Sequence, residues 1–145
     1  MGDSDPLEIL QNSLLGAPII WKGDYPYFIH PISDGIPRMD AKVLRATRDL
    51  IVNSVDWEEI DLIVSVEAMG LPLLAAVGEK TGKPTVVIRK RTYGMEGEVR
   101  VDVSTGYSES TVYINDIRAG EKILIVDDVI STGGTLQPIL QTLED

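Results

Sequence analysis

The sequence predicts an α/β fold in which a mainly parallel sheet is flanked by helices. Three short apolar runs have the character of strands that are covered on both faces, and they are residues 61–66, 84–88 and 122–126. Helical patterns follow the first and the third run, and such alternation is typical of parallel sheets. Polar segments leave the carboxyl ends of these runs, where ligands of parallel sheets bind.

The first part of the chain predicts helices and a short hairpin. Asp5 suits an N-cap and Pro6 the first helical position, and leucines follow at helical spacing. Residues 18–30 read as two extended pieces around the turn Lys22-Gly23-Asp24. From Asp40 onward, a helix carries apolar residues on one side.

The later elements complete the layered fold. A helix over residues 70–82 follows the first apolar run and ends near its glycine. Residues 98–103 alternate and predict an exposed hairpin arm, and residues 111–115 predict another strand. A last helix over residues 135–145 tolerates Pro138 in its first turn. Because such a helix normally returns to another strand, we expect the sheet to lack a C-terminal strand.

Length and composition restrict the class of protein. A chain of 145 residues fits a single domain, and the absence of cysteine excludes disulfides and thiolate metal sites. The net charge of -10, from 23 acids against 13 bases, argues against binding to nucleic acid. No apolar run is long enough for a bilayer and no signal peptide is visible, so we expect a cytoplasmic protein without a membrane partner.

A glycine-containing turn lies between the third apolar run and the last helix. Its backbone amides and the positive end of the helix dipole favour a phosphate, and each hydrogen bond to a charged group contributes roughly 1.5–3 kcal/mol. A helix cap with a flexible turn is the alternative. The residues of this turn are Ser131, Thr132, Gly133, Gly134 and Thr135.

Two adjacent acids, Asp127 and Asp128, precede this turn. Both are expected to be ionised at neutral pH, since an unperturbed aspartate has a pKa of about 3.9. At a separation of ~5 Å and an effective dielectric constant of about 20, they repel by on the order of 3 kcal/mol. Hydroxyl donors, a hard cation or both would offset this repulsion, and Mg²⁺ often bridges substrate phosphates. Alternatively, one acid faces solvent while the other caps the loop.

The stretch ILIVDDVISTGGTL, residues 123–136, resembles the phosphoribosyl-pyrophosphate signature of type I phosphoribosyltransferases. The resemblance extends from about Ala17 to the last residue. It is closest to the purine branch, particularly the archaeal hypoxanthine/guanine phosphoribosyltransferases, on EAMG, VIRKR.YG..GEV and TGYSES..YINDI. It implies a Mg²⁺-dependent pentosyltransferase that moves the phosphoribosyl group onto a purine, giving a nucleoside 5′-monophosphate and pyrophosphate.

The resemblance assigns roles to the motifs around the sheet. Asp127 and Asp128 would be catalytic, binding the ribose hydroxyls and contacting the metal only through substrate or water. Residues 131–135 would bind the 5′-phosphate. A pyrophosphate loop with a non-proline cis peptide bond near Glu67-Ala68 would act with a basic cluster, which by itself also fits a solvated run. The expected pyrophosphate residues are Glu67, Ala68, Met69, Gly70, Arg89, Lys90 and Arg91.

Other segments are expected to cover the substrates. Residues 92 to about 108 match a mobile loop that closes over the site, with Tyr93 and Tyr107. Ser131 and Gly106 replace acids found in related enzymes, so Glu109 is a substitute candidate for proton handling. His30 is expected to be structural. Within a single domain of residues 1–145, residues 17–37 would form a hood over the base and 61–145 the sugar-phosphate core.

The base itself is expected to meet aromatic and apolar side chains. The three aromatic residues could stack on the purine ring or form the core of the hood, and we expect at least one of them in that core. The candidates are Tyr25, Tyr27, Phe28, Val129 and Ile130.

Three readings of the activity remain open on the sequence alone. Hypoxanthine or guanine is favoured as the base, and adenine is the first alternative. A non-catalytic regulator that senses phosphoribosyl pyrophosphate is the second. The family implies a homodimer.

Overall fold

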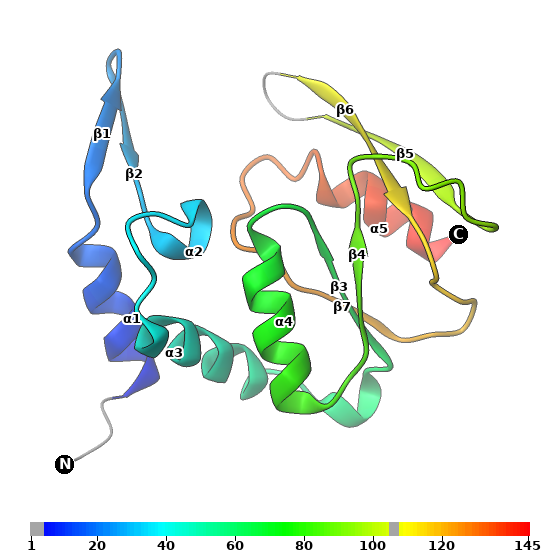
Figure 1. Cartoon of the computed structure of the whole chain (residues 1–145), viewed down its shortest axis with the longest axis horizontal. Helices are drawn as coiled ribbons and strands as arrows, with labels where there is room; N and C mark the ends of the chain where they lie inside the picture. Colours follow the sequence, from blue (N-terminus) through cyan, green and yellow to red (C-terminus); the bar gives the residue numbers. More distant parts are fainter. Residues whose placement is uncertain (1–4, 105–107) are drawn as a thin grey trace.

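The computed structural model describes residues 5–104 and 108–145. Its centre is a parallel sheet of β3 (Leu62–Val66), β4 (Thr85–Ile88) and β7 (Ile123–Ile125), in the order β4-β3-β7 (Figure 1). Val64 of β3 pairs with Val86 of β4 and with Ile125 of β7. The three apolar runs therefore form one sheet with their carboxyl ends at the same edge, as predicted.

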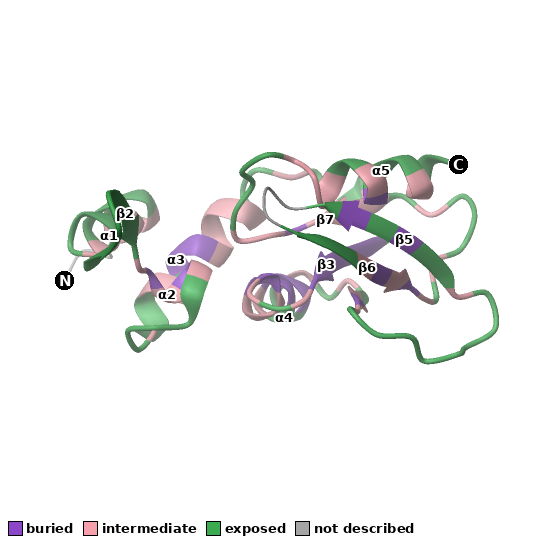
Figure 2. Ribbon diagram, turned by 90° about the horizontal axis from the view of Figure 1, so that it is seen from above, coloured by how far each residue is buried: buried purple, intermediate pink, exposed green. Residues whose placement is uncertain are grey.

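Every residue of β3 is buried, because both faces of the sheet are covered. Alternate residues pack into two separate clusters: Leu62, Val64 and Val66 face Ile139 of helix α5 (Leu136–Glu144). Ile63 belongs to the second cluster, with the apolar side of helix α4 (Gly70–Thr81). Figure 2 shows the purple, buried residues of α4 and β3, with α5 on the other side of the sheet. Continuous apolar runs are typical of strands covered in this way.

Helix α3 (Ala41–Val52) begins, and helix α4 ends, at the residues that the sequence predicts. Helix α3 is capped by Asp40, whose carboxylate accepts a hydrogen bond from the amide of Lys42 at 2.9 Å. Helix α4 ends at Gly82, whose φ of 71° is the left-handed conformation that glycine tolerates best. Pro138 lies in the first turn of α5, as expected. A short 3₁₀ helix, η1 (Trp57–Glu59), leads into β3.

A two-stranded hairpin of β5 (Val99–Ser104) and β6 (Glu109–Ile114) extends the molecule beside α5 (Figure 1). Arg89 joins it to the end of β4 through two backbone hydrogen bonds with Tyr113. The expectation of an exposed arm is wrong for one face of β5: Val101 and Val103 are 5% and 4% exposed and pack in the cluster of Ile139. The alternation of apolar and polar residues along β5 arises because one face of the strand is buried and the other is exposed.

The N-terminal elements are helix α1 (Pro6–Leu15), the hairpin of β1 (Ile19–Lys22) and β2 (Tyr25–Phe28), and helix α2 (Pro31–Asp34). They lie to one side of the sheet in Figure 1 and contact the rest through α3 and α4. The expectation that at least one hood aromatic is core is wrong. Tyr25, Tyr27 and Phe28 are 62%, 36% and 53% exposed, because β1 and β2 pair only with each other among the described strands.

His30 is buried and structural. Its Nδ1 accepts a hydrogen bond from the amide of Ile32 at 3.1 Å, which caps α2, and its Nε2 lies 2.9 Å from the hydroxyl of Ser13. Burial lowers the pKa of His30, although Asp34 opposes this effect. The side chain thus ties α1 to α2 as a neutral imidazole.

In the part of the chain that the structure describes, no strand follows α5, and β7 has a neighbour on one side only. Within the same residues, none of the helices combines the length and apolar character needed to cross a bilayer. The division into a hood and a core remains a prediction.

Candidate active site

Three loops at the carboxyl edge of the sheet enclose a cavity of about 210 Å³. One loop follows β3, one follows β4 and one follows β7, which are the three places that the sequence singles out. The lining residues share these loops and the adjoining hairpin: Val66, Glu67, Ala68, Lys90, Val103, Ser110, Val112 and residues 127–136. The two acids, the glycine turn and one of the cluster's bases therefore meet in one place.

The turn before α5 has the geometry of an anion cradle. Gly133 has a φ of 79°, which strains any residue with a side chain. A Cβ on Gly134 would lie 2.0 Å from the carbonyl oxygen of Ser104, so the turn packs directly on the backbone of β5. The amide of Ser104 also donates a hydrogen bond of 3.1 Å to the carbonyl of Gly134. Small residues are required here because the hairpin approaches so closely.

The start of α5 lies at this turn. Thr135 occupies the N-cap position, and its side chain accepts no capping hydrogen bond from the first turn of the helix. The amide of Gln137 donates to the carbonyl of Gly133 at 2.9 Å and Pro138 has no amide hydrogen, but the helix dipole still places a partial positive charge at this end. Together with the glycine turn, this end of α5 suits a phosphate.

The two acids lie side by side at the end of β7. The amide of Asp128 donates a hydrogen bond of 2.8 Å to Oδ1 of Asp127. Burial raises the pKa of Asp128 to about 7, and the hydrogen bond and charge of Asp127 and the charge of Asp34 add to this effect. At neutral pH Asp128 is therefore only partly ionised, and the expectation of full ionisation of both acids does not hold for it. Hydrogen-bond donors or a cation bound beside Asp127 and Asp128 would offset the repulsion between the carboxylates.

A second cavity of about 220 Å³ shares the two acids and Val129 with the first. Phe28 of β2, His30 and Leu73 of α4 are among its mainly apolar lining residues. A flat ring placed here would lie beside a sugar held at the acids. Ile130 lines the first cavity instead, while the rings of Tyr25 and Tyr27 contact each other at a tilt of 55°, with centroids 4.6 Å apart.

The loop after β3 contains the cis peptide bond between Glu67 and Ala68, as expected from the family resemblance. Gly70 follows, and a Cβ there would lie 2.1 Å from Oγ of Ser65 and 3.0 Å from Oδ1 of Asp127. Met69 instead approaches Gly35, the residue that ends α2. The loop is thus held between the acids and the N-terminal elements.

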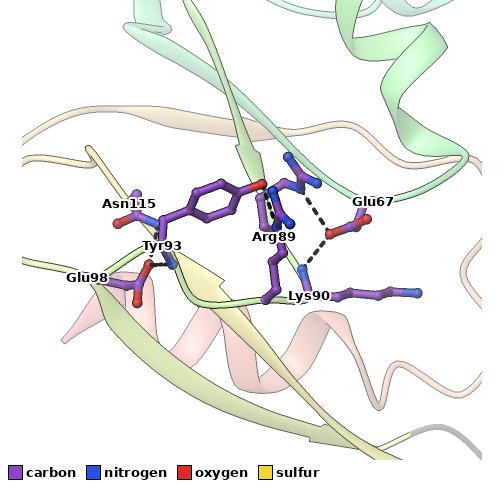
Figure 3. A network of polar contacts seen from close by, with 7 residues as sticks. Glu67, Arg89, Lys90, Tyr93, Glu98 and Asn115 are labelled. Atoms are coloured by element: carbon purple, nitrogen blue, oxygen red, sulfur yellow. Dashed lines mark hydrogen bonds and ion pairs between the residues drawn. The ribbon is translucent and has the colours of Figure 1, made fainter. Parts of the chain in front are cut away.

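The three basic residues after β4 have different surroundings, and Figure 3 shows those of Arg89 and Lys90. Arg89 donates from Nε to Oε1 of Glu67 at 3.0 Å, and the amide of Lys90 donates to the same oxygen at 2.6 Å. These bonds lower the pKa of Glu67, led by the bond from the amide of Lys90. Lys90 lines the first cavity, whereas Arg91 donates from Nε to the hydroxyl of Tyr93 at 3.0 Å.

The remaining candidates are placed less centrally. Glu109 does not line the cavity of the acids; it lines a polar cavity with Arg100 and Asp102, which adjoins the first at Val103 and Ser110. Tyr107 lies outside the described residues. Residues 99–104 of the expected mobile loop form β5, and the motion itself remains a prediction.

Sequence reasoning missed three residues of this region. Glu98 and Asn115 form a hydrogen bond of 2.9 Å across the base of the hairpin. Ser65 is fully buried, and its hydroxyl has no hydrogen-bond partner among the described residues. Ser65 had a visible signal, since it is the polar residue inside an apolar run. Glu98 and Asn115 meet only through the hairpin register, which pairs Val99 with Ile114.

The acidic side chains of the site decide which kind of metal ion it could hold. No group of three or more histidine, cysteine or acidic residues gathers around one point in the described segments. Two adjacent carboxylates beside an anion cradle fit a hard cation that takes most of its ligands from a phosphorylated substrate and water.

Comparisons with known proteins agree with this geometry. Residues 35–145 match the family model described as "Phosphoribosyl transferase domain". The chain is 52% identical over 139 residues to a hypoxanthine/guanine phosphoribosyltransferase of Methanohalophilus mahii, covering 96% of this chain and 73% of that protein. A protein of the same name from Aciduliprofundum boonei is 48% identical over 138 residues, covering 95% of this chain and 75% of that protein.

Solved structures show the same fold at low sequence identity. An adenine phosphoribosyltransferase from Thermoanaerobacter pseudethanolicus has a TM-score of 0.76 and 21% identity, covering 93% of this chain and 79% of that one. The enzyme of the same name from Saccharomyces cerevisiae has a TM-score of 0.73 and 22% identity, covering 95% of this chain and 83% of that one. With the family match and the relatives near 50% identity, these findings establish that the chain belongs to the phosphoribosyltransferase family.

Proposed function

We propose that this chain is a purine salvage enzyme that transfers the phosphoribosyl group of 5-phosphoribosyl 1-pyrophosphate to hypoxanthine or guanine. One observation carries the proposal: a single cavity brings together paired acids, an anion cradle and a lysine at the end of a parallel sheet. The choice of base follows the similarity to hypoxanthine/guanine phosphoribosyltransferases near 50% identity. The similarity to adenine phosphoribosyltransferases is near 20% and bears on the fold alone.

Different residues of the site bind different parts of the substrates. Asp127 and Asp128 accept hydrogen bonds from the ribose hydroxyls, and residues 131–135 hold the 5′-phosphate. Lys90 and the bases beside it meet the diphosphate, while Glu67 holds Arg89 in place. The purine occupies the adjoining cavity, where Phe28 lies.

In the reaction, a purine ring nitrogen gives up its proton to solvent and forms a bond to C1 of the ribose, while the bond from C1 to the diphosphate oxygen breaks. Positive charge develops on the sugar ring and negative charge on the leaving diphosphate. Lys90 and the bases beside it offset the negative charge on the diphosphate, while the positive end of α5 holds the 5′-phosphate in place, so catalysis is mainly positional and electrostatic. Closure of residues 92–108 would exclude water from the reacting sugar.

Mg²⁺ is the proposed cofactor. Asp127 and Asp128 would hold it through substrate oxygens and water, and the bound ion would supply additional positive charge next to the diphosphate.

The proposal is tested by measuring pyrophosphate release with hypoxanthine, guanine, adenine and xanthine in separate reactions with magnesium. We expect turnover with hypoxanthine or guanine and at least tenfold lower kcat/KM with adenine. Turnover with adenine alone would contradict the choice of base. Binding of the sugar substrate without turnover on any of the four bases would contradict an enzyme and support a sensing role.

We further propose a cytoplasmic homodimer, as the family resemblance implies. Light scattering of the purified protein would test the dimer directly, and a mass of one chain at micromolar concentration would contradict it.

A further inference from the structure

We propose that Tyr93, held by Glu98, is a positioning residue that orients Arg89 and Arg91 toward the diphosphate of the sugar substrate. The inference rests on the proposed function and extends it to two residues that do not line the cavity of the acids in the described structure. Figure 3 shows Tyr93 between the basic residues and Glu98.

Glu98 fixes the backbone that carries Tyr93. Its carboxylate accepts hydrogen bonds from the hydroxyl of Thr92 at 2.5 Å, from the amide of Tyr93 at 2.9 Å and from Nδ2 of Asn115 at 2.9 Å. These bonds, led by that from Thr92, lower the pKa of Glu98 to about 2. The carboxylate is therefore ionised at any pH at which the enzyme would work, and the segment from Thr92 to Glu98 is closed on itself.

Tyr93 in turn gathers two cations. The guanidinium carbon of Arg91 lies 4.7 Å from the centroid of the Tyr93 ring, and that of Arg89 lies 5.3 Å from it. Both distances are within the range of cation–π attraction. Nε of Arg91 also donates to the tyrosine hydroxyl at 3.0 Å. Two like charges separated by one residue would otherwise move apart, and the ring offers both a common electron-rich surface.

Arg89 is held from two directions. Its Nε is bound by Glu67, a residue that lines the cavity, and its guanidinium also lies over Tyr93. This contact links the loop after β3 to the segment that Glu98 closes. Arg89 thus has a defined side-chain direction before substrate arrives, which reduces the entropy lost on binding an anion.

The same network connects the bases to the phosphate cradle. Glu98 precedes β5 and Asn115 follows β6, so their bond closes one end of the hairpin. At the far end of β5, Ser104 bonds to Gly134 of the cradle. The hairpin therefore sets the distance between the bases and the 5′-phosphate position. A substrate that carries phosphates at both ends must match this distance in order to bind.

The test compares Tyr93→Leu with Tyr93→Phe, which keeps the ring and loses only the hydroxyl. Glu98→Gln removes the charge at the anchor, and Glu96→Gln is a matched control in the same segment. Steady-state kinetics give KM for the sugar substrate, KM for the base and kcat, and titration calorimetry gives the affinity for magnesium pyrophosphate. Thermal melting checks that each variant is folded.

We expect Tyr93→Leu to weaken pyrophosphate binding and raise KM for the sugar substrate by about three- to tenfold, with KM for the base unchanged. Tyr93→Phe should stay within about twofold of wild type, Glu98→Gln should fall between the two, and Glu96→Gln should behave as wild type. Unchanged pyrophosphate affinity in folded Tyr93→Leu would overturn the inference, as would an equal rise in both KM values.

Failure of the inference is distinguishable from failure of the proposed function. A wild-type chain that binds magnesium pyrophosphate without transferring a phosphoribosyl group contradicts the proposed function, while the affinities still decide the role of Tyr93. An active wild-type enzyme whose Tyr93→Leu variant binds pyrophosphate equally well contradicts the inference alone.

Discussion

Replacement of Asp128 by asparagine should stabilise the fold while it impairs turnover. In the folded chain the pKa of this carboxyl rises from 3.8 to about 7, mainly because of burial and then because of Asp127. A carboxyl with a raised pKa holds its proton more tightly in the folded state, so the stability of the wild type falls as pH rises from about 4 to about 7 and is constant above that range.

The size of the effect follows from the environment of Asp128. Each tenfold change in proton affinity corresponds to about 1.4 kcal/mol. Because Asp128 is only partly buried, solvent screening reduces the total, and we expect the Asp128→Asn variant to be more stable by ~1–2 kcal/mol at pH 8. Near pH 4 the variant and the wild type should be equally stable.

Urea unfolding of both proteins at several pH values measures this difference. Asp24→Asn, an exposed change of the same charge in the β1–β2 turn, is the control and should show no pH-dependent gain. In parallel, the turnover of Asp128→Asn should fall by at least tenfold, since a carboxylate that accepts from a ribose hydroxyl is lost. A variant with wild-type stability at every pH would refute the argument that the acids are crowded.

Three further changes test other parts of the site. Gly134→Ala should reduce stability by about 1–3 kcal/mol and weaken ribose 5-phosphate binding in calorimetry, because its Cβ meets Ser104; unchanged values would show that the cradle can move away from the hairpin. Lys90→Met should raise KM for the sugar substrate by about tenfold or more, with Lys80→Met unchanged, and equal KM values for the two would remove Lys90 from the diphosphate site. Ser65→Ala should leave the free energy of unfolding in urea within about 1 kcal/mol of wild type, because the hydroxyl has no partner in the described structure, and a loss above that would reveal one.

Much of the fold is predictable from the sequence because burial leaves a direct pattern. Residues 62–66 are apolar apart from one serine, and this is what a strand covered by α4 and α5 requires. The end of α4 at Gly82 and the cap at Asp40 follow from the conformations of those residue types. The acids and the glycine turn are equally visible, since paired charges at the end of an apolar run need a partner.

Long-range packing explains what the sequence did not reveal. The contact of Glu98 with Asn115 depends on the register of a hairpin, and neither residue alone signals it. The raised pKa of Asp128 depends on how deeply the loop after β7 is covered, which no local pattern encodes. The exposure of Tyr25 was also unpredictable, because aromatic alternation looks the same in a hood that is packed and in one that is open.

The central claim is that one sheet-to-helix connection holds a phosphorylated pentose, and a crystal structure with ribose 5-phosphate tests it most directly. We predict phosphate oxygens within hydrogen-bond distance of residues 131–135 and the sugar hydroxyls on Asp127 and Asp128. A sugar phosphate bound elsewhere on the chain, or this cavity left empty at saturating ligand, would contradict the account.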